Sequence, residues 1–124
     1  MKELSNTYDL EERTARFAEK VIDFVRLLKN DCVNDRIISQ LVGAVGSIGA
    51  NYCEATEAES KKDFVHKIAI CKKEAKEARH WLRLVARANP EHKNSIRAFW
   101  KEANELLFIF AKINRSSKSG KKKI

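Results

Sequence analysis

The side chains that could hold a metal ion are few in this chain. Glu77 and His80 form an E-x-x-H, the ligand spacing of helical di-iron carboxylate sites, and Glu54 and Glu57 could add carboxylates. Such sites need a second E-x-x-H and further carboxylates, whereas this chain has three His and no second copy of the motif. A metal-dependent enzyme therefore remains a minor alternative. We expect His80 to lie on the flank of a helix, and we expect no bound metal or cofactor.

The cysteines offer little more chemistry. Cys32, Cys53 and Cys71 are odd in number and form no C-x-x-C pair, which excludes a disulfide framework and a four-cysteine zinc site. No spacing connects these thiols to an activating base, and no Gly-rich phosphate loop of the Walker or Rossmann kind is present. We therefore expect a protein without enzymatic activity whose thiols are buried or idle. No apolar run reaches the ~18 residues of a membrane span, and the first residues lack a signal peptide, so we expect a cytoplasmic protein that does not contact membranes.

Positive charge is concentrated in the second half of the sequence. The net charge is +8, but residues 1–60 carry seven Lys/Arg against eleven Asp/Glu, and residues 61–124 carry eighteen against six. In the second half the basic residues recur at helical spacing, accompanied by His66 and His80. The candidate nucleic-acid-binding residues are Lys62, Lys72, Lys73, Lys76, Arg79, Arg83, Arg87, Lys93, Arg97 and Lys101.

Cations on a rigid helix can follow phosphates and release counterions, which gives affinity without base recognition. The pattern therefore predicts nonspecific binding of RNA or DNA, with the lysines of the C-terminal tail extending the electrostatic reach. An alternative is an ordinary solvated face, in which Asp63–Lys67 and Lys73–Glu77 pair at i, i+4. A second alternative is a protein-protein adaptor whose charged halves contact another protein.

A polar stripe lies elsewhere in the sequence. Ser47, Asn51 and Glu54 recur at i, i+4 and i+7, and Glu74 belongs to the helix expected to face them. We interpret these four residues as a structural polar network that sets the register of the helices. A ligand site and a solvated edge remain the alternatives.

The elements that must position these residues follow from composition and periodicity. The 124 residues suit one domain, and 44% hydrophobic residues with four Gly and one Pro favour long helices. Ser60–Asp63 resembles a capping box and Asn89–Pro90 ends a helix. Apolar spacing predicts four helices, over about Asp9–Lys29, Asp35–Ala58, Lys61–Ala88 and a segment marked by Ile96–Ile113.

Short connections between these helices predict an all-α, up-down-up-down antiparallel four-helix bundle over residues 1–114. We expect residues 115–124, with five positive charges and no acid, to form a disordered basic tail.

Three glycines interrupt the second predicted helix. Gly43, Gly46 and Gly49 each cost up to about 1 kcal/mol relative to Ala. We expect close approach of another helix to offset this cost, inside the bundle or in a neighbouring subunit. The alternative is a helix broken near Gly46.

Three segments of the sequence resemble a known family. They are SIGANYCEA at 47–55, SKKDFVHKI at 60–68 and KEAKEARHWL at 73–82. They are similar to bacterial four-helix-bundle proteins encoded within intervening sequences of 23S ribosomal RNA genes, and the resemblance covers about residues 8–114. A similar fold is known for the basic accessory protein of diversity-generating retroelements, a partner of a reverse transcriptase.

The resemblance implies a bundle that assembles as a ring, a homopentamer, with no established enzymatic activity and an association with nucleic acid. The family pattern Ser-Ile-x-Ala-Asn-x-x-Glu-Ala falls on Ser47, Ile48, Ala50, Asn51, Glu54 and Ala55, where it implies a structural role. Assembly would also bury the aromatic residues that occupy more than one face of the last helix, namely Phe99, Trp100, Phe108 and Phe110.

Overall fold

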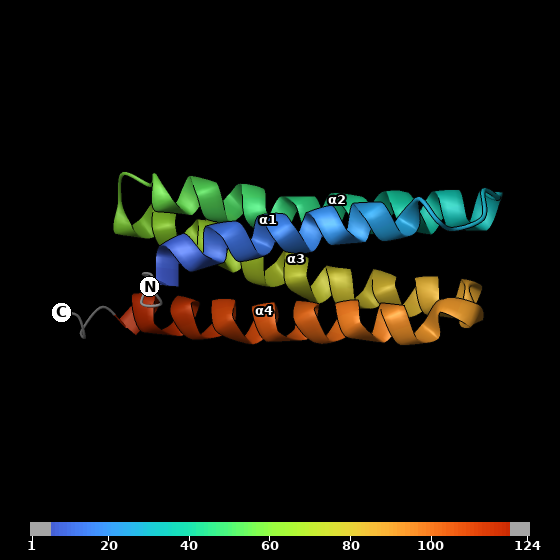
Figure 1. Ribbon diagram of the computed structural model, residues 1–124. Coiled ribbons are helices and arrows are strands. Elements are labelled where there is room, and N and C mark those ends of the chain that lie inside the picture. The colour runs from blue at the N-terminus through green and yellow to red at the C-terminus, as the bar shows by residue number, and fades with distance from the viewer. Residues whose placement is uncertain (1–5, 120–124) are drawn as a thin grey trace.

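The computed structural model describes residues 6–119, and all regular elements within them are helical (Figure 1). No strand occurs in this range, which confirms the expected all-α class and is consistent with a four-helix bundle. None of the helices described is long and apolar enough to cross a membrane. The elements are α1 (Asn6–Val25), α2 (Cys32–Thr56), α3 (Lys61–Ala88), the short 3-10 helix η1 (Pro90–His92) and α4 (Lys93–Ser119).

Local signals set the helix ends. The Ser60 side chain accepts a hydrogen bond from the backbone N–H of Asp63 at 3.0 Å, and α3 begins and ends where the sequence predicted. At the other end, Pro90 opens η1 after the Asn89 cap. Helix α2 starts earlier than expected because Asp31 caps it, accepting from the backbone N–H of Asn34 at 2.8 Å.

Contacts between neighbouring helices join residues in opposite order along the chain. Glu54 and Cys71 illustrate this for α2 and α3: Glu54 meets Lys67, while the Cys71 thiol donates to the carbonyl of Ile48. Figure 1 shows the chain direction alternating from α1 to α4, with the colour running back and forth along the molecule. Helix α3 lies against both α2 and α4 and supplies buried side chains along most of its length: Ile68, Cys71, Ala75, Ala78, Leu82 and Val85.

Two buried asparagines lock the end of the bundle where α2 begins and α3 ends. The Nδ2 of Asn34 donates to Asn89 Oδ1 at 3.1 Å, and the Nδ2 of Asn89 donates to Asn34 Oδ1 at 2.9 Å. Each amide also donates to a backbone carbonyl, of Lys29 and Val85 respectively. Because their donors are satisfied inside the protein, the pair can be buried without a large desolvation cost.

The glycines of α2 behave differently from one another. The helix continues unbroken through Gly46, so the broken-helix alternative is wrong. A Cβ built on Gly49 would lie 3.1 Å from Thr14 Oγ1 of α1, and this is the expected close approach. A Cβ on Gly43 or Gly46 would meet nothing within 4 Å, so close packing inside this chain does not explain these two.

The C-terminal helix is longer than expected. Helix α4 runs to Ser119, so residues 115–119 are helical although they were expected to belong to the disordered tail. The Nδ2 of Asn114 donates to the carbonyl of Val65 at 3.1 Å, which holds this end of α4 against α3. Lys118 in the last turn also favours helix continuation through its interaction with the helix dipole. The expected tail at 120–124 lies outside the described residues.

Candidate nucleic-acid interface

Arg79 shows which side of α3 faces α4. Its Nη1 donates to the Oδ1 of Asn104 at 2.7 Å, and its guanidinium carbon lies 5.5 Å from the ring centroid of Trp100. Both partners belong to α4. Arg79 is half-buried in this seam, so it holds the two helices together and is less free than the other candidate cations.

Helix periodicity places most of the candidate cations beside this seam. On α3, positions three, four, seven and eight residues from Arg79 share its side of the helix, and on α4 the positions near Trp100 do the same. We call the resulting set the basic face: Lys72, Lys76, Arg79, Arg83, Arg87, Lys93, Arg97 and Lys101. Lys62 and Lys73 lie farther round α3, toward its outer side. Except for Arg79 and Lys72, which are half-buried, all ten candidates are exposed.

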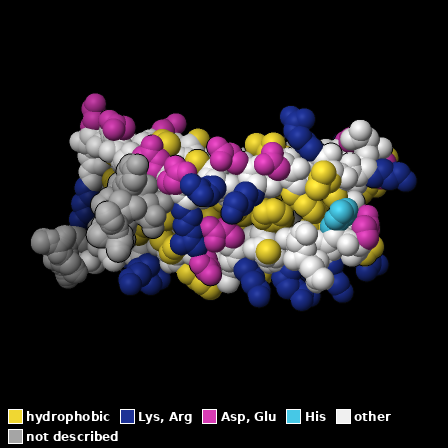
Figure 2. All heavy atoms as spheres, in the orientation of Figure 1, with side chains coloured by type: hydrophobic (Ala, Val, Ile, Leu, Met, Phe, Trp, Pro, Cys, Tyr) yellow, Lys and Arg dark blue, Asp and Glu magenta, His cyan; other side chains and the backbone are white. Residues whose placement is uncertain are grey.

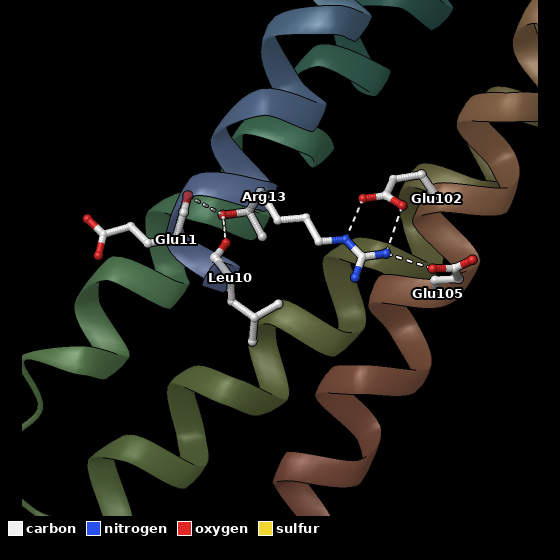
Figure 3. A network of polar contacts seen from close by, with 6 residues as sticks. Leu10, Glu11, Arg13, Glu102 and Glu105 are labelled. Atoms are coloured by element: carbon white, nitrogen blue, oxygen red, sulfur yellow. Dashed lines mark hydrogen bonds and ion pairs between the residues drawn. The ribbon is translucent and has the colours of Figure 1, made fainter. Parts of the chain in front are cut away.

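Carboxylates of α4 lie on the opposite flank, where α1 holds them (Figure 3). The Nε of Arg13 lies 2.8 Å from Glu102 Oε2, and its Nη2 lies 2.9 Å from Glu102 Oε1 and 2.7 Å from Glu105 Oε1. The hydrogen bonds that Arg13 donates to Glu102, together with the charges of Glu102 and Glu105, raise the pKa of Arg13 despite partial burial. Glu102 and Glu105 are the only acidic residues in α4, and one arginine of α1 binds both. Glu105 remains 66% exposed and stands one turn from Lys101, at the edge of the basic face.

Two of the three carboxylates of α3 lie on its α2 side, and the third, Glu77, is exposed one turn from Lys73. Lys67 Nζ lies 2.7 Å from Glu54 Oε1, and this hydrogen bond raises the pKa of Lys67. Asp63 and Glu74 stand four residues before and seven after Lys67, and therefore share that side. The expected i, i+4 pairs with Asp63 and Glu77 do not form as ion pairs; Lys67 reaches across to α2 instead. Among the side chains of residues 10–119, no carboxylate forms an ion pair with the basic face.

The two charges are unevenly distributed over the surface. In Figure 2, most side chains along the lower α4 edge that carry a charge are Lys and Arg, while Asp and Glu are most numerous over the upper part; carboxylates also interrupt the lower part, and Lys and Arg also lie in the middle of the view. Arg83 and Arg87 also line a hollow of about 670 Å³ together with Leu84, Ala86 and Pro90. Phosphate groups could approach such a surface without displacing a carboxylate already bound to the cations.

Two aromatic side chains are exposed on α4 beside these cations. Trp100 is 36% exposed and Phe108 is 62% exposed. Their neighbours Phe99 and Phe110 point into the bundle: Phe99 packs near aromatic rings of α1, and Phe110 lies 5.8 Å from Tyr52 by ring centroids. Only part of the aromatic set is therefore left for an external contact.

The expected polar network is only partly joined. Asn51 Nδ2 donates to the carbonyl and the Oγ of Ser47, each at 2.9 Å. Glu54 pairs instead with Lys67, and Glu74 makes no hydrogen bond or ion pair with other residues in the described range. Partial desolvation and the nearby charge of Glu77 raise the pKa of Glu74. The four residues lie on the facing sides of α2 and α3, but as separate contacts.

The cysteine thiols and one apolar cavity lie apart from the basic face. Cys32 and Cys53 are exposed, whereas Cys71 is buried and its burial raises the pKa of its thiol to about 12. Among the side chains described, those of residues 10–119, no group of three or more His, Cys, Asp or Glu is placed to hold a metal ion. A cavity of about 800 Å³ at one end of the bundle is lined chiefly by apolar side chains, among them Leu10, Phe64, Ile109 and Ile113.

A comparison with known protein families identifies the family of this chain. The model of the 23S rRNA-intervening sequence protein family matches residues 7–119. The chain belongs to this family. The resemblance carried by residues 47–82 is thereby confirmed, and the match extends over all four helices.

A solved structure supports the assignment to this family. A protein of unknown function from the S23 ribosomal protein family of Bacteroides thetaiotaomicron is similar, with 25% identity and a TM-score of 0.77. The similarity covers 90% of this chain and 99% of that chain. No curated protein matches the sequence.

Sequence reasoning did not assign Arg13, Trp100 and Phe108 to the candidate interface. Arg13 stood beside the core stripe of the first helix, but its two partners lie 89 and 92 positions away. Trp100 and Phe108 were noted only as aromatics on more than one face. Their displacement from the core spacing of Ile96, Ala103 and Phe110 was the available signal.

Proposed function

We propose that this member of the 23S rRNA-intervening sequence protein family is a non-enzymatic, homo-oligomeric bundle that binds RNA or DNA without sequence specificity. The basic face and the neighbouring Lys62 and Lys73 contact the phosphates in this proposal. The scaffold is an up-down-up-down antiparallel bundle, which the opposite order of the contacts between helices supports. The family name, which refers to ribosomal RNA genes, is consistent with an RNA ligand.

The observation that carries the proposal is the separation of charge across α3 and α4. A solvated outer face normally mixes both signs, and its cations are partly neutralised by i, i+4 carboxylates. Here Arg13 of α1 binds both carboxylates of α4, and the α2 carboxylate Glu54 pairs with Lys67, which is not part of the basic face. The cations left beside the Arg79 seam can therefore act together on a polyanion.

Assembly is the second part of the proposal. A homopentamer of chains at +8 would carry about +40, a field that steers polyanions toward the particle. Gly43 and Gly46 on α2 are exposed and a Cβ there would meet nothing within 4 Å, so alanine variants at these positions distinguish a contact with another copy from open solvent. Light scattering coupled to size-exclusion chromatography measures the order of the assembly, and a monomer at all concentrations would contradict it.

Charge reversal tests nucleic-acid binding. Replacing Lys72, Lys76 and Arg83 by Glu should greatly weaken binding to RNA, and the slope of log K against log salt, about 0.9 per neutralised phosphate for a duplex, should become shallower. Fluorescence anisotropy with labelled RNA at about 50 mM salt and above measures both quantities.

A matched control separates the basic face from total charge. Lys20, Arg26 and Arg36 are exposed and lie on α1, the turn after it, and α2, so their replacement by Glu changes the net charge equally. This control should retain substantially more affinity than the first variant. Equal losses would show that net charge alone is responsible, and wild-type protein that binds neither duplex nor single-stranded RNA would refute the function itself.

A protein-protein adaptor, for example a partner of a reverse transcriptase, is the alternative function. Leu27 and Val33, 72% and 56% exposed, flank the turn between α1 and α2 and offer an apolar contact away from the basic face. Copurification of one defined protein after nuclease treatment, and its loss in a Leu27→Asp variant, would favour the adaptor.

A further inference from the structure

We propose that Trp100 and Phe108 make the basic face a site for single-stranded nucleic acid, in which bases stack on the two rings while the cations hold the phosphates. This inference rests on the proposed function and specifies its ligand. Stacking on exposed aromatic rings is the usual means of sequence-independent single-strand binding, because every base has a π-face.

The Trp100 ring is held in place before any ligand arrives. Arg79 lies over the ring with 5.5 Å between the guanidinium carbon and the ring centroid, and Asn104 fixes the guanidinium through a 2.7 Å hydrogen bond. The indole nevertheless remains 36% exposed. A fixed, partly open ring can receive a base with little loss of side-chain entropy.

Phe108 provides a second platform on the same helix. It is 62% exposed, so most of the free energy that burial of an aromatic side chain would contribute to folding is not gained. At ~1.5 Å per residue it stands about 12 Å from Trp100 along α4, which a few stacked bases can span. Around Phe108 at helical spacing lie Asn104, Lys101 and Lys112, none of which would repel a phosphate. Glu105 is a fourth neighbour, and Arg13 binds its carboxylate at 2.7 Å.

The surroundings of the rings favour a single strand over two other occupants. A duplex keeps its bases stacked on one another, so it could use the cations but would leave both rings without a partner. A second copy that pairs through the same face in a two-fold dimer would bring Arg97 and Lys101 against their own counterparts, which like-charge repulsion disfavours. A ring contact, which joins two different faces, is distinguished by the light-scattering measurement below. A flexible strand satisfies the rings and the cations together.

The test compares a labelled single-stranded oligouridine with an RNA duplex of equal length at several salt concentrations. Trp100→Ala and Phe108→Ala should each weaken single-strand binding roughly fivefold or more, and leave duplex affinity unchanged. Trp100→Phe, which keeps a ring, should recover most of the loss. Leu27→Ala, which removes the 72% exposed side chain outside the basic face, serves as the matched control and should leave both affinities unchanged.

Several results would overturn this inference. Unchanged single-strand affinity in both alanine variants, or equal losses on single strand and duplex, would show that the rings do not stack with bases while the proposed function stands. A change in the order of the assembly measured by light scattering, with unchanged affinity per chain, would assign the rings to a subunit contact. A wild-type protein that binds neither RNA would remove the proposed function and this inference together.

Discussion

Alanine substitution at the glycines of α2 tests whether another helix packs closely against each of them. Gly43 and Gly46 lie in the interior of an unbroken helix, and a Cβ at either position would meet nothing within 4 Å. Ala should therefore add helix propensity without a steric cost. Each substitution should raise the free energy of unfolding by about 0.5–1 kcal/mol.

The two gains should add, because neither site has a neighbour that the other could move. The double variant should be more stable by about 1–2 kcal/mol, which corresponds to a rise of roughly 3–10 °C in Tm for a domain of this size. Thermal and urea unfolding followed by far-UV circular dichroism measure both quantities.

Gly49 provides the internal contrast. Its Cβ would lie 3.1 Å from Thr14 Oγ1, and that hydroxyl is held by the carbonyls of Leu10 at 2.8 Å and Glu11 at 3.2 Å. Thr14 is also buried, so it cannot move freely away. Crowding should cancel the gain in propensity, and Gly49→Ala should leave the protein no more stable than wild type or destabilise it by about 1–3 kcal/mol.

The relative stabilities of the three alanine variants show whether Gly43 and Gly46 face open space. If Gly43→Ala or Gly46→Ala lowers the Tm, the reasoning from open space is refuted. A loss that grows with protein concentration would then identify a close contact with another copy, because only the assembled state would lack room for the methyl group.

Three further outcomes follow from the contacts described above. Asn89→Ala should lower the free energy of unfolding by about 1–3 kcal/mol, because it leaves the buried amide of Asn34 without its partner. Urea unfolding measures this loss, and a loss below a few tenths of a kcal/mol would contradict the role of the pair. Cys71 should react with a thiol reagent only on unfolding, whereas the two exposed cysteines react at once, and three equal rates would show that the core is open. Glu74→Gln should stabilise the fold slightly at neutral pH, because the raised pKa of Glu74 means that its charged form is disfavoured in the folded protein. The gain should disappear below the ordinary Glu pKa, where the carboxyl is protonated in both states. Equal urea midpoints for wild type and variant at every pH would refute this.

The sequence by itself determined the features that depend on near neighbours. The bounds of α3, its Ser60 cap and the stop at Asn89 follow from residues within one or two turns of one another. The apolar spacing likewise identified most core positions, because helix geometry repeats every 3.6 residues whatever surrounds it. Membership of the family also followed from a local pattern, at residues 47–82.

Tertiary structure alone decided which charges remain free. The bonds of Arg13 to Glu102 and of Lys67 to Glu54, and the Asn34–Asn89 pair, depend on how each helix is rotated about its axis. Packing of the whole core sets that rotation, so no local spacing reports it. The basic residues could be counted in the sequence, but only the folded bundle shows that no carboxylate among the side chains of residues 10–119 forms an ion pair with the basic face.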